Sequence, residues 1–467
     1  MVNWTNDQLK AITQNGSDIL VSAAAGSGKT AVLVERIVRK LLDENNPIDI
    51  DRMLVVTFTE AAASEMKEKI IRALKKEGSP RANLQLKMSG SACITTIDSF
   101  CLKCLRSNFH RIGIDPEFGI CDKAEAELLK EEVCDELFDN LYKTEITEDK
   151  ERFVRMIDNF ASNRNDYSLK NLVLFVYKFI QSFPEPEKWM TEKVKMYDLS
   201  ADELFESEWI CEIIDICKNA SQTYLNEYSK LLENMASICG DYSSVDELMV
   251  RYPYYDKSDK LCPVHEMYDA WAGQWNAVLL AVEATKMLSA VFDKENNKEI
   301  RDELFRVYPI ALGGEYFPDV RIAGNARNNE HWYDYNARRK ELNDGLKDAL
   351  SVFECRTSDE IAHIISESKN NTEDIIWLVT MFGNEYMSQK EKKGFYEFSD
   401  IEHMTYNLFQ QQDLCDEYRE KYDEILIDEY QDTNGLQDAI FRSISKNNIF
   451  MVGDLKQSIY RFRGGDP

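Results

Sequence analysis

A run of small residues followed by Lys and Thr is the clearest chemical signal in the sequence. Residues 23–30 read Ala-Ala-Ala-Gly-Ser-Gly-Lys-Thr, between an apolar stretch at 18–22 and an amphipathic stretch at 29–43. Small residues let backbone N–H groups approach phosphate oxygens, and a following helix N-terminus adds a favourable dipole. The pattern predicts a phosphate-binding loop, with Lys29 on the β- and γ-phosphates and Thr30 on Mg²⁺. The residues expected to hold the nucleotide are Ala23, Ala24, Ala25, Gly26, Ser27, Gly28, Lys29, Thr30 and Ala31, although Ala23 replaces the usual glycine.

An acidic pair near the end of the sequence could supply the acid that a phosphate loop needs on a neighbouring strand. Asp428 and Glu429 directly follow the apolar residues 425–427. Ligands of open α/β sheets bind at the carboxyl ends of the strands. Asp428 would hold Mg²⁺ through water, and Glu429 would accept the proton of the attacking water. An acidic pair alone is equally typical of a plain strand end, so the prediction of ATP and Mg²⁺ as ligands rests on its combination with Lys29 and Thr30.

A third block, residues 452–463, combines polar and aromatic side chains. Asp454 ends another apolar stretch, and the Gln457 amide would read the γ-phosphate or its attacking water. Tyr460 and Phe462 alternate with Arg461 and Arg463. Aromatic faces stack on bases and guanidinium groups contact phosphates, which indicates binding of single-stranded nucleic acid. The alternative is a pair of core aromatic residues beside solvated arginines.

These residues require a parallel sheet to bring them together. Short apolar stretches at 18–22, 52–58, 93–96, 424–428 and 449–453 alternate with amphipathic stretches at 29–43, 60–76, 98 onward and 434–444. Such alternation predicts parallel strands with right-handed helical crossovers. Long amphipathic stretches at 123–142, 225–238 and 372–392 lie between the two parts. We therefore predict an α/β fold of residues 1–115 and 395–467, interrupted by a mainly α-helical insertion at 116–394.

Composition limits the other classes of function. The 467 residues carry a net charge of −27, yet residues 1–113 hold 16 Lys and Arg against 12 Asp and Glu. Polyanion binding is therefore expected on the first part, and the acidic remainder is either a solvated helical surface or a docking surface. We find no apolar run of about 18 residues and no basic, apolar leader, which predicts a cytoplasmic protein without a membrane span. The 11 cysteines are expected to be reduced, and Cys101 and Cys104 have no second ligand pair for zinc.

Several blocks in this order resemble the UvrD/Rep/PcrA class of superfamily 1 DNA helicases, and in detail the A subunits of bacterial AddAB helicase–nucleases. The blocks are residues 4–8, 18–36, 54–59, 99–101, 398–401, 427–434 and 452–463. The resemblance implies a RecA-like domain 1A for the α/β part and a duplex-holding domain 1B for the insertion. It also implies single-stranded and duplex DNA as substrates. The partner that it implies for the full-length protein is a B-type helicase–nuclease subunit.

The resemblance further implies roles for individual residues. Gln8 would read adenine with its two-way amide, and Arg36 would line the adenine site. Phe58 would wedge between bases, and Gln457 would couple the γ-phosphate to the grip on DNA. The expected DNA contacts are Thr57, Phe58, Thr59, Thr96, Tyr460, Phe462 and Arg463, with Phe462 where many relatives carry Trp. Asp98 and Glu60 depart from the His and Asn that are frequent in the family, and both add negative charge near the strand path.

The same resemblance predicts how this chain behaves by itself. Family members continue into a second RecA-like domain that carries arginine fingers, and AddA-type members also carry a nuclease domain. We therefore expect this chain alone to hydrolyse ATP very slowly, without unwinding or nuclease activity. Three alternatives remain open at this point: a phosphate-loop ATPase acting on protein, a UvrD-like helicase without nuclease, and a catalytically inactive assembly module.

Overall fold

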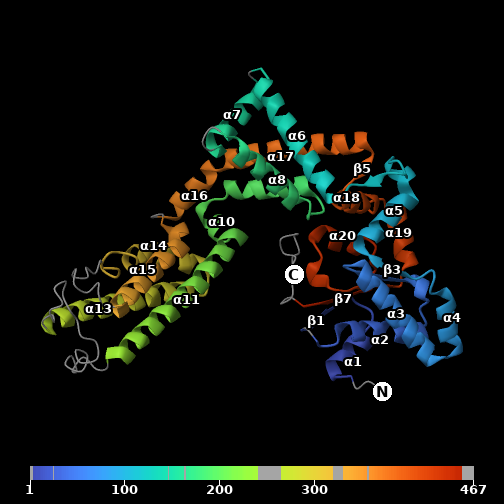
Figure 1. Ribbon diagram of the computed structural model, residues 1–467, viewed down its shortest axis with the longest axis horizontal. Helices are drawn as coiled ribbons and strands as arrows, with labels where there is room; N and C mark the ends of the chain where they lie inside the picture. Colours follow the sequence, from blue (N-terminus) through green and yellow to red (C-terminus); the bar gives the residue numbers. More distant parts are fainter. Residues whose placement is uncertain are drawn as a thin grey trace. The chain divides into compact units, whose positions relative to one another are not determined.

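The computed structural model describes residues 4–24, 26–145, 147–161, 165–239, 264–318, 330–354 and 357–454. The chain divides into two compact units (Figure 1). Unit 1 consists of Met1–Thr191 and Asn371–Pro467, and unit 2 of Glu192–Asn370.

A five-stranded parallel sheet forms the centre of unit 1 (Figure 1). Its strand order is β1-β7-β6-β2-β3, so two strands from the end of the chain lie between two from its beginning. The strands are β1 (Ile19–Ser22), β2 (Met53–Thr57), β3 (Cys93–Thr96), β6 (Glu424–Ile427) and β7 (Ile449–Gly453). All five predicted strands are confirmed, as is the α/β fold class.

Helices cover both faces of this sheet. Every residue of β2 is buried, with Leu54 and Val56 in one apolar cluster and Met53 and Val55 in the other. Such two-sided burial is typical of parallel strands between helical layers. The first layer comprises α1 (Asn6–Thr13), α2 (Lys29–Leu42), α3 (Glu60–Glu77) and α4 (Pro80–Met88), and η1 (Ile50–Arg52) leads into β2. The second comprises α5 (Ile97–Ile112), α18 (Phe398–Leu408), α19 (Gln412–Lys421) and α20 (Gly435–Ser443).

A helical part of unit 1 has its own apolar cluster. It contains α6 (Lys123–Lys143), α7 (Glu148–Phe160), α8 (Tyr167–Ile180), α9 (Pro186–Val194) and α17 (Lys369–Lys393). A two-stranded parallel sheet of β4 (Gly119–Ile120) and β5 (Phe395–Tyr396) joins the two segments of chain that lead to the large sheet. Residues 116–191 and 371–394, which sequence analysis assigned to the insertion, thus belong to the same compact unit as the sheet.

Unit 2 is a bundle of helices around a separate apolar core. Its elements are η2 (Lys195–Asp198), α10 (Ala201–Phe205), α11 (Glu208–Cys239), α13 (Val264–Phe292), α14 (Asn297–Ala311), α15 (Glu330–Leu350), η5 (Ser351–Phe353) and α16 (Ser358–Glu367). No membrane span was predicted from the sequence, yet the stretch Gly273–Phe292 has the length and composition of a membrane-spanning helix. Half of that stretch is buried, and Val278, Ala281 and Leu288 lie in the core of the bundle.

Candidate nucleotide-binding site

The phosphate loop connects β1 to α2 at the carboxyl edge of the sheet. The Ala23 N–H donates to the carbonyl of Gly453 at 3.0 Å, which fixes the loop beside the end of β7. Gly28 precedes α2 with φ 84°, a left-handed conformation that favours glycine. No side chain caps the N-terminus of α2, so its first N–H groups remain available for an anion.

The acidic pair lies where this loop ends. The Asp428 N–H donates to the carbonyl of Val56 at 2.9 Å, which places Asp428 directly beyond the strand pairing of β6 with β2. Lys29 Nζ donates to Glu429 Oε2 at 3.2 Å, although the two residues are 400 positions apart. Burial raises the pKa of Asp428, and the neighbouring charge of Glu429 raises it further. A bound cation would favour the ionised form of Asp428 and so offset both effects.

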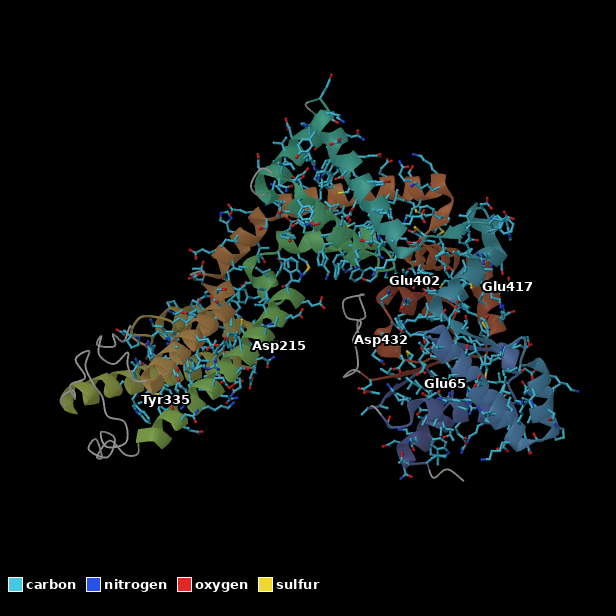
Figure 2. All side chains as sticks on the ribbon, viewed as in Figure 1. Glu65, Asp215, Tyr335, Glu402, Glu417 and Asp432 are labelled. Atoms are coloured by element: carbon cyan, nitrogen blue, oxygen red, sulfur yellow. The ribbon has the colours of Figure 1, made fainter. Side chains whose placement is uncertain are left out.

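One cavity of about 390 Å³ is lined by residues of both the phosphate loop and the acidic pair. Its lining combines the phosphate-loop threonine, the loop after β2, helix α3 and the loop after β6. The lining residues are Thr30, Thr57, Phe58, Thr59, Ala62, Glu65, Met66, Lys69, Asp428, Glu429, Gln431 and Asp432. Two of them, Glu65 and Asp432, are labelled in Figure 2. The predicted meeting of Thr30 with Asp428 around one ligand is therefore possible within unit 1.

Buried polar atoms in this region fit a phosphate and a cation. Within the described residues, Ser27 Oγ and Asp432 Oδ1 are buried without a hydrogen-bond partner. Such atoms are costly in a folded protein unless a ligand or water satisfies them. Ser27 belongs to the phosphate loop, and Asp432 lines the cavity with Thr30 and Asp428. Hydroxyl and carboxylate oxygens are the ligands that Mg²⁺ prefers.

Gln8 lies beside the phosphate loop. Its Nε2 donates to the carbonyl of Ser27 at 2.9 Å. The same side chain forms a capping box with Thr5 at the start of α1, since its Oε1 accepts the Thr5 N–H at 2.9 Å. The residue predicted to read adenine is thus fixed next to the loop, and its reading of adenine stays a prediction.

Arg36 is buried and has several partners within the protein. Its side chain is 3% exposed, and Nε donates to Glu424 Oε1 at 2.7 Å. Nη1 donates to the carbonyls of Ala11 and Gln14 at 2.8 Å and 2.7 Å, and the guanidinium lies over the ring of Phe450. Glu424 begins β6, so Arg36 lies toward the edge of the sheet opposite to the phosphate loop. It anchors the end of α1, and its place beside the adenine stays a prediction.

The threonines predicted to contact DNA also form hydrogen bonds within the protein. Thr59 and Thr96 are N-caps: their hydroxyls accept the N–H groups of Ala62 at 3.1 Å and Ser99 at 3.2 Å. Thr57 donates its hydroxyl hydrogen to the carbonyl of Thr59 at 3.0 Å. Phe58 lies between them and lines the cavity. Their contacts with DNA stay predictions.

Five predicted site residues lie outside the described part of the chain. They are Ala25, Gln457, Tyr460, Phe462 and Arg463.

Gln431 and Asp432 line the cavity although sequence analysis gave them no role. Both belong to η6 (Tyr430–Asp432), the turn after the acidic pair. Burial raises the pKa of Asp432, and Glu429 raises it further. The only signal in the sequence was their place in the block 427–434, because the burial of a turn is decided by distant parts of the chain.

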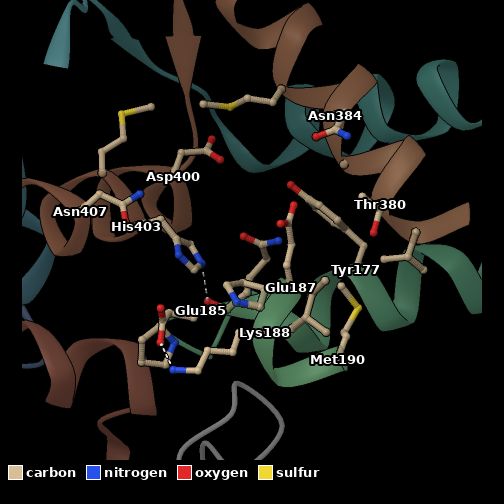
Figure 3. Close-up of a pocket in the computed structure, with 18 residues that line it drawn as sticks. Tyr177, Glu185, Glu187, Lys188, Met190, Thr380, Asn384, Asp400, His403 and Asn407 are labelled. Carbon is tan, nitrogen blue, oxygen red and sulfur yellow. Dashed lines mark hydrogen bonds and ion pairs between the residues drawn. The ribbon is translucent and has the colours of Figure 1, made fainter. Parts of the chain in front are cut away.

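A second cavity, of about 480 Å³, lies among α8, α9, α17 and α18 in unit 1 (Figure 3). The ring of His403 points to its rim, with Nε2 3.2 Å from the carbonyl of Gln181. Burial lowers the pKa of His403. None of the residues of the phosphate loop or the acidic pair lines this cavity, so it is separate from the nucleotide site.

The chain is similar to a known family of proteins. Residues 4–467 match the UvrD/REP helicase N-terminal domain. The chain is 35% identical over 493 residues to the A subunit of the ATP-dependent helicase/nuclease of Ruminiclostridium cellulolyticum, covering 99% of this chain and 36% of that protein. It is 34% identical to the protein of the same name from Clostridium novyi and 35% identical to that from Bacillus pumilus, again covering 36% of each. The chain thus spans about a third of the length of these relatives, and it belongs to the UvrD/REP helicase N-terminal domain family.

Proposed function

We propose that this chain is the first motor half of an ATP-dependent DNA helicase, of the type found in the A subunits of helicase/nucleases, and that it acts in double-strand break repair and recombination. The observation that carries the proposal is the contact of Lys29 with Glu429 at the cavity that Thr30 and Asp428 also line. This arrangement brings together a phosphate-binding cation, an ionisable base and two cation ligands. The family membership and the relatives' shared name support DNA as the substrate and assembly with a second subunit.

Each residue of the site has a task in the proposed reaction. Lys29 and the N–H groups at the start of α2 would bind the phosphates, and Thr30 and Asp428 would hold Mg²⁺. The cation would neutralise charge on the phosphate oxygens. Glu429 would orient the attacking water and accept its proton. Gln8, which lies on α1, would recognise the adenine base.

Binding of nucleotide to the chain tests the first half of the proposal. We expect Lys29→Ala to abolish MgATP binding, because the phosphates lose their cation. Glu429→Gln should bind MgATP at least as well as the wild type, since it removes the carboxylate that pairs with Lys29. Titration with a fluorescent ATP analogue measures both. Equal affinity of wild type and Lys29→Ala would refute the assignment of the phosphate loop.

Binding of single-stranded DNA tests the second half. We expect a salt-dependent affinity that Phe58→Ala weakens by about tenfold, in line with the loss of one stacked base. Phe175→Ala is the matched control, because Phe175 is 68% exposed on α8 and does not line the cavity. Fluorescence anisotropy of a labelled oligonucleotide measures both variants. A chain that binds ATP and shows no affinity for DNA would instead favour an ATPase acting on protein.

A further inference from the structure

The side chain of Gln431 joins the turn after β6 to the end of β7. Gln431 is 4% exposed. Its Nε2 donates to Glu429 Oε2 at 2.8 Å, and its Oε1 accepts the N–H of Asp454 at 2.8 Å. One amide therefore holds both the carboxylate of the proposed base and the backbone of the residue that follows β7.

Two side chains donate hydrogen bonds to the carboxylate of Glu429. Glu429 Oε2 accepts hydrogen bonds from Lys29 at 3.2 Å and from Gln431 at 2.8 Å. In the proposed reaction Lys29 turns to the phosphates, and the amide of Gln431 remains on that oxygen. The Glu429 backbone is left-handed, with φ 53°, a conformation that is unfavourable for a residue other than glycine. Such a conformation persists where surrounding contacts hold it.

Gly453 provides the space for the amide. A Cβ on Gly453 would lie 2.8 Å from Gln431 Oε1 and 3.1 Å from the Gln431 backbone nitrogen. Real Cβ atoms essentially never approach other atoms to 2.8 Å, so the amide or the strand would have to move. A larger residue at position 453 would therefore act on the Gln431 amide first.

We propose that Gln431 is a positioning residue for ATP hydrolysis, which keeps the Glu429 carboxylate against the end of β7 while Lys29 binds the phosphates. This inference rests on the function proposed above. It assigns to Gln431 a share in turnover and little in nucleotide affinity. Its two short hydrogen bonds go to the proposed base and to the Asp454 backbone, and its contact with Asp432 Oδ2 is longer, at 3.5 Å. Its loss should therefore lower kcat and leave the Kd for MgATP nearly unchanged.

Three variants separate the contacts of Gln431. Gln431→Met removes both hydrogen bonds at similar volume. Gln431→Glu keeps an acceptor for the Asp454 N–H but loses the donor to Glu429. Gly453→Ala displaces the amide without changing Gln431 itself. All are made in the full-length gene product, and kcat is measured with saturating single-stranded DNA.

Two controls match these variants elsewhere in unit 1. Gln85 is fully buried and bridges in the same way, since its Oε1 accepts the Ile50 N–H at 2.8 Å and its Nε2 donates to Asp49 Oδ1 at 2.6 Å. These contacts lie at the start of β2, away from the cavity. Gln85→Glu therefore reports the structural cost of such a change. Gly90→Ala is the control for the added methyl group, because a Cβ at Gly90 meets no atom within 4 Å.

The expected result is a fall in kcat of about tenfold or more in all three variants, with the Kd for MgATP within about threefold of wild type. Gln85→Glu should lower the Tm and keep kcat within about twofold. The double variant of Gln431→Met with Gly453→Ala should be no slower than the slower single variant, because both act on one contact. A normal kcat in either Gln431 variant, or a parallel loss of MgATP affinity, would overturn the inference. A wild type that neither binds nor hydrolyses ATP would refute the proposed function itself.

Discussion

At the scale of single residues, Glu402 is a buried carboxyl next to another acid. It is 5% exposed on α18, is labelled in Figure 2, and accepts a hydrogen bond from Gln437 Nε2 at 2.6 Å. Burial raises the pKa of Glu402 to about 8, and the charge of Asp98 and a side-chain hydrogen bond with it add to this effect. A protonated Glu402 would avoid two like charges side by side.

This proton makes the stability of unit 1 depend on pH. Because the folded-state pKa of Glu402 is about 8 and its ordinary value is 4.5, the folded protein binds a proton that the unfolded chain releases between these values. The free energy of unfolding should therefore fall as pH rises from about 5 to about 8, by up to about 1.4 kcal/mol for each pH unit. Urea unfolding at pH 5.5 and 8.5 measures the difference.

Glu402→Gln is the control for that pH dependence. The amide keeps the shape and cannot ionise, so the variant should lose less stability than the wild type between the two pH values. An identical pH dependence of wild type and variant would show that Glu402 does not hold the proton.

At the scale of elements, a buried arginine connects α1 to β6. Arg36 binds carbonyls of α1 and of the turn after it, and it pairs with Glu424, which also pairs with Lys40. Arg36→Met should destabilise the protein by about 3 kcal/mol, since Lys40 still partly compensates the buried carboxylate. It should also reduce the preference for ATP over GTP, because Gln8 is carried on α1. Urea unfolding and competition between the two nucleotides measure the two effects.

Arg39→Met is the control for Arg36→Met. Arg39 lies on the same helix, is 43% exposed and pairs with Glu35 one turn away. Its loss should change the free energy of unfolding by no more than about 0.5 kcal/mol and leave nucleotide preference intact. Equal effects of both substitutions would contradict the anchoring role of Arg36.

A buried lysine joins α17 to α18 in a comparable way. The Lys390 side chain is fully buried, donates to both oxygens of Asp400 at 2.6 Å and 2.5 Å, and lies over the ring of Tyr386. Lys390→Met should cost about 3–5 kcal/mol because it leaves Asp400 buried without its cation. Adding Asp400→Asn should recover part of that loss, as thermal unfolding of the single and double variants would show. A double variant less stable than Lys390→Met would argue against this account.

At the scale of the whole molecule, local patterns predicted the elements better than their grouping. The strands were predictable because each is a short apolar run between polar turns, and the phosphate loop and acidic pair because their spacing is specific. The amphipathic pattern of α6 or α17 shows that one face is buried and does not show against which core. For that reason the border between the units, at residues 191 and 371, was not predicted. The ion pair of Arg36 was not predicted for a similar reason, since its partner Glu424 is 388 residues away.

Unit 2 should fold without the rest of the chain. Its apolar core runs from Leu204 to Ile361 and contains no residue of unit 1. A fragment of residues 192–370 is therefore expected to be helical by circular dichroism and to unfold cooperatively on heating. Residues 116–191 alone should not do so, because their core needs Leu378, Phe382 and Tyr386 from α17. Absence of a cooperative transition in the first fragment would contradict this division.

The strand order also determines when the sheet can form during protein synthesis. β6 and β7 lie between β1 and β2. The two strands that connect β1 to the rest of the sheet are therefore synthesised last. At ~5–20 residues per second, roughly 15–65 s separate the emergence of β3 from that of β6. During this interval β2 and β3 can pair with each other, but β1 has no strand beside it and one edge of β2 stays open. These exposed apolar strands would need a chaperone to keep them from aggregating. A translation product that stalls before residue 424 would carry the phosphate-loop motif without the acidic pair that faces it in the cavity.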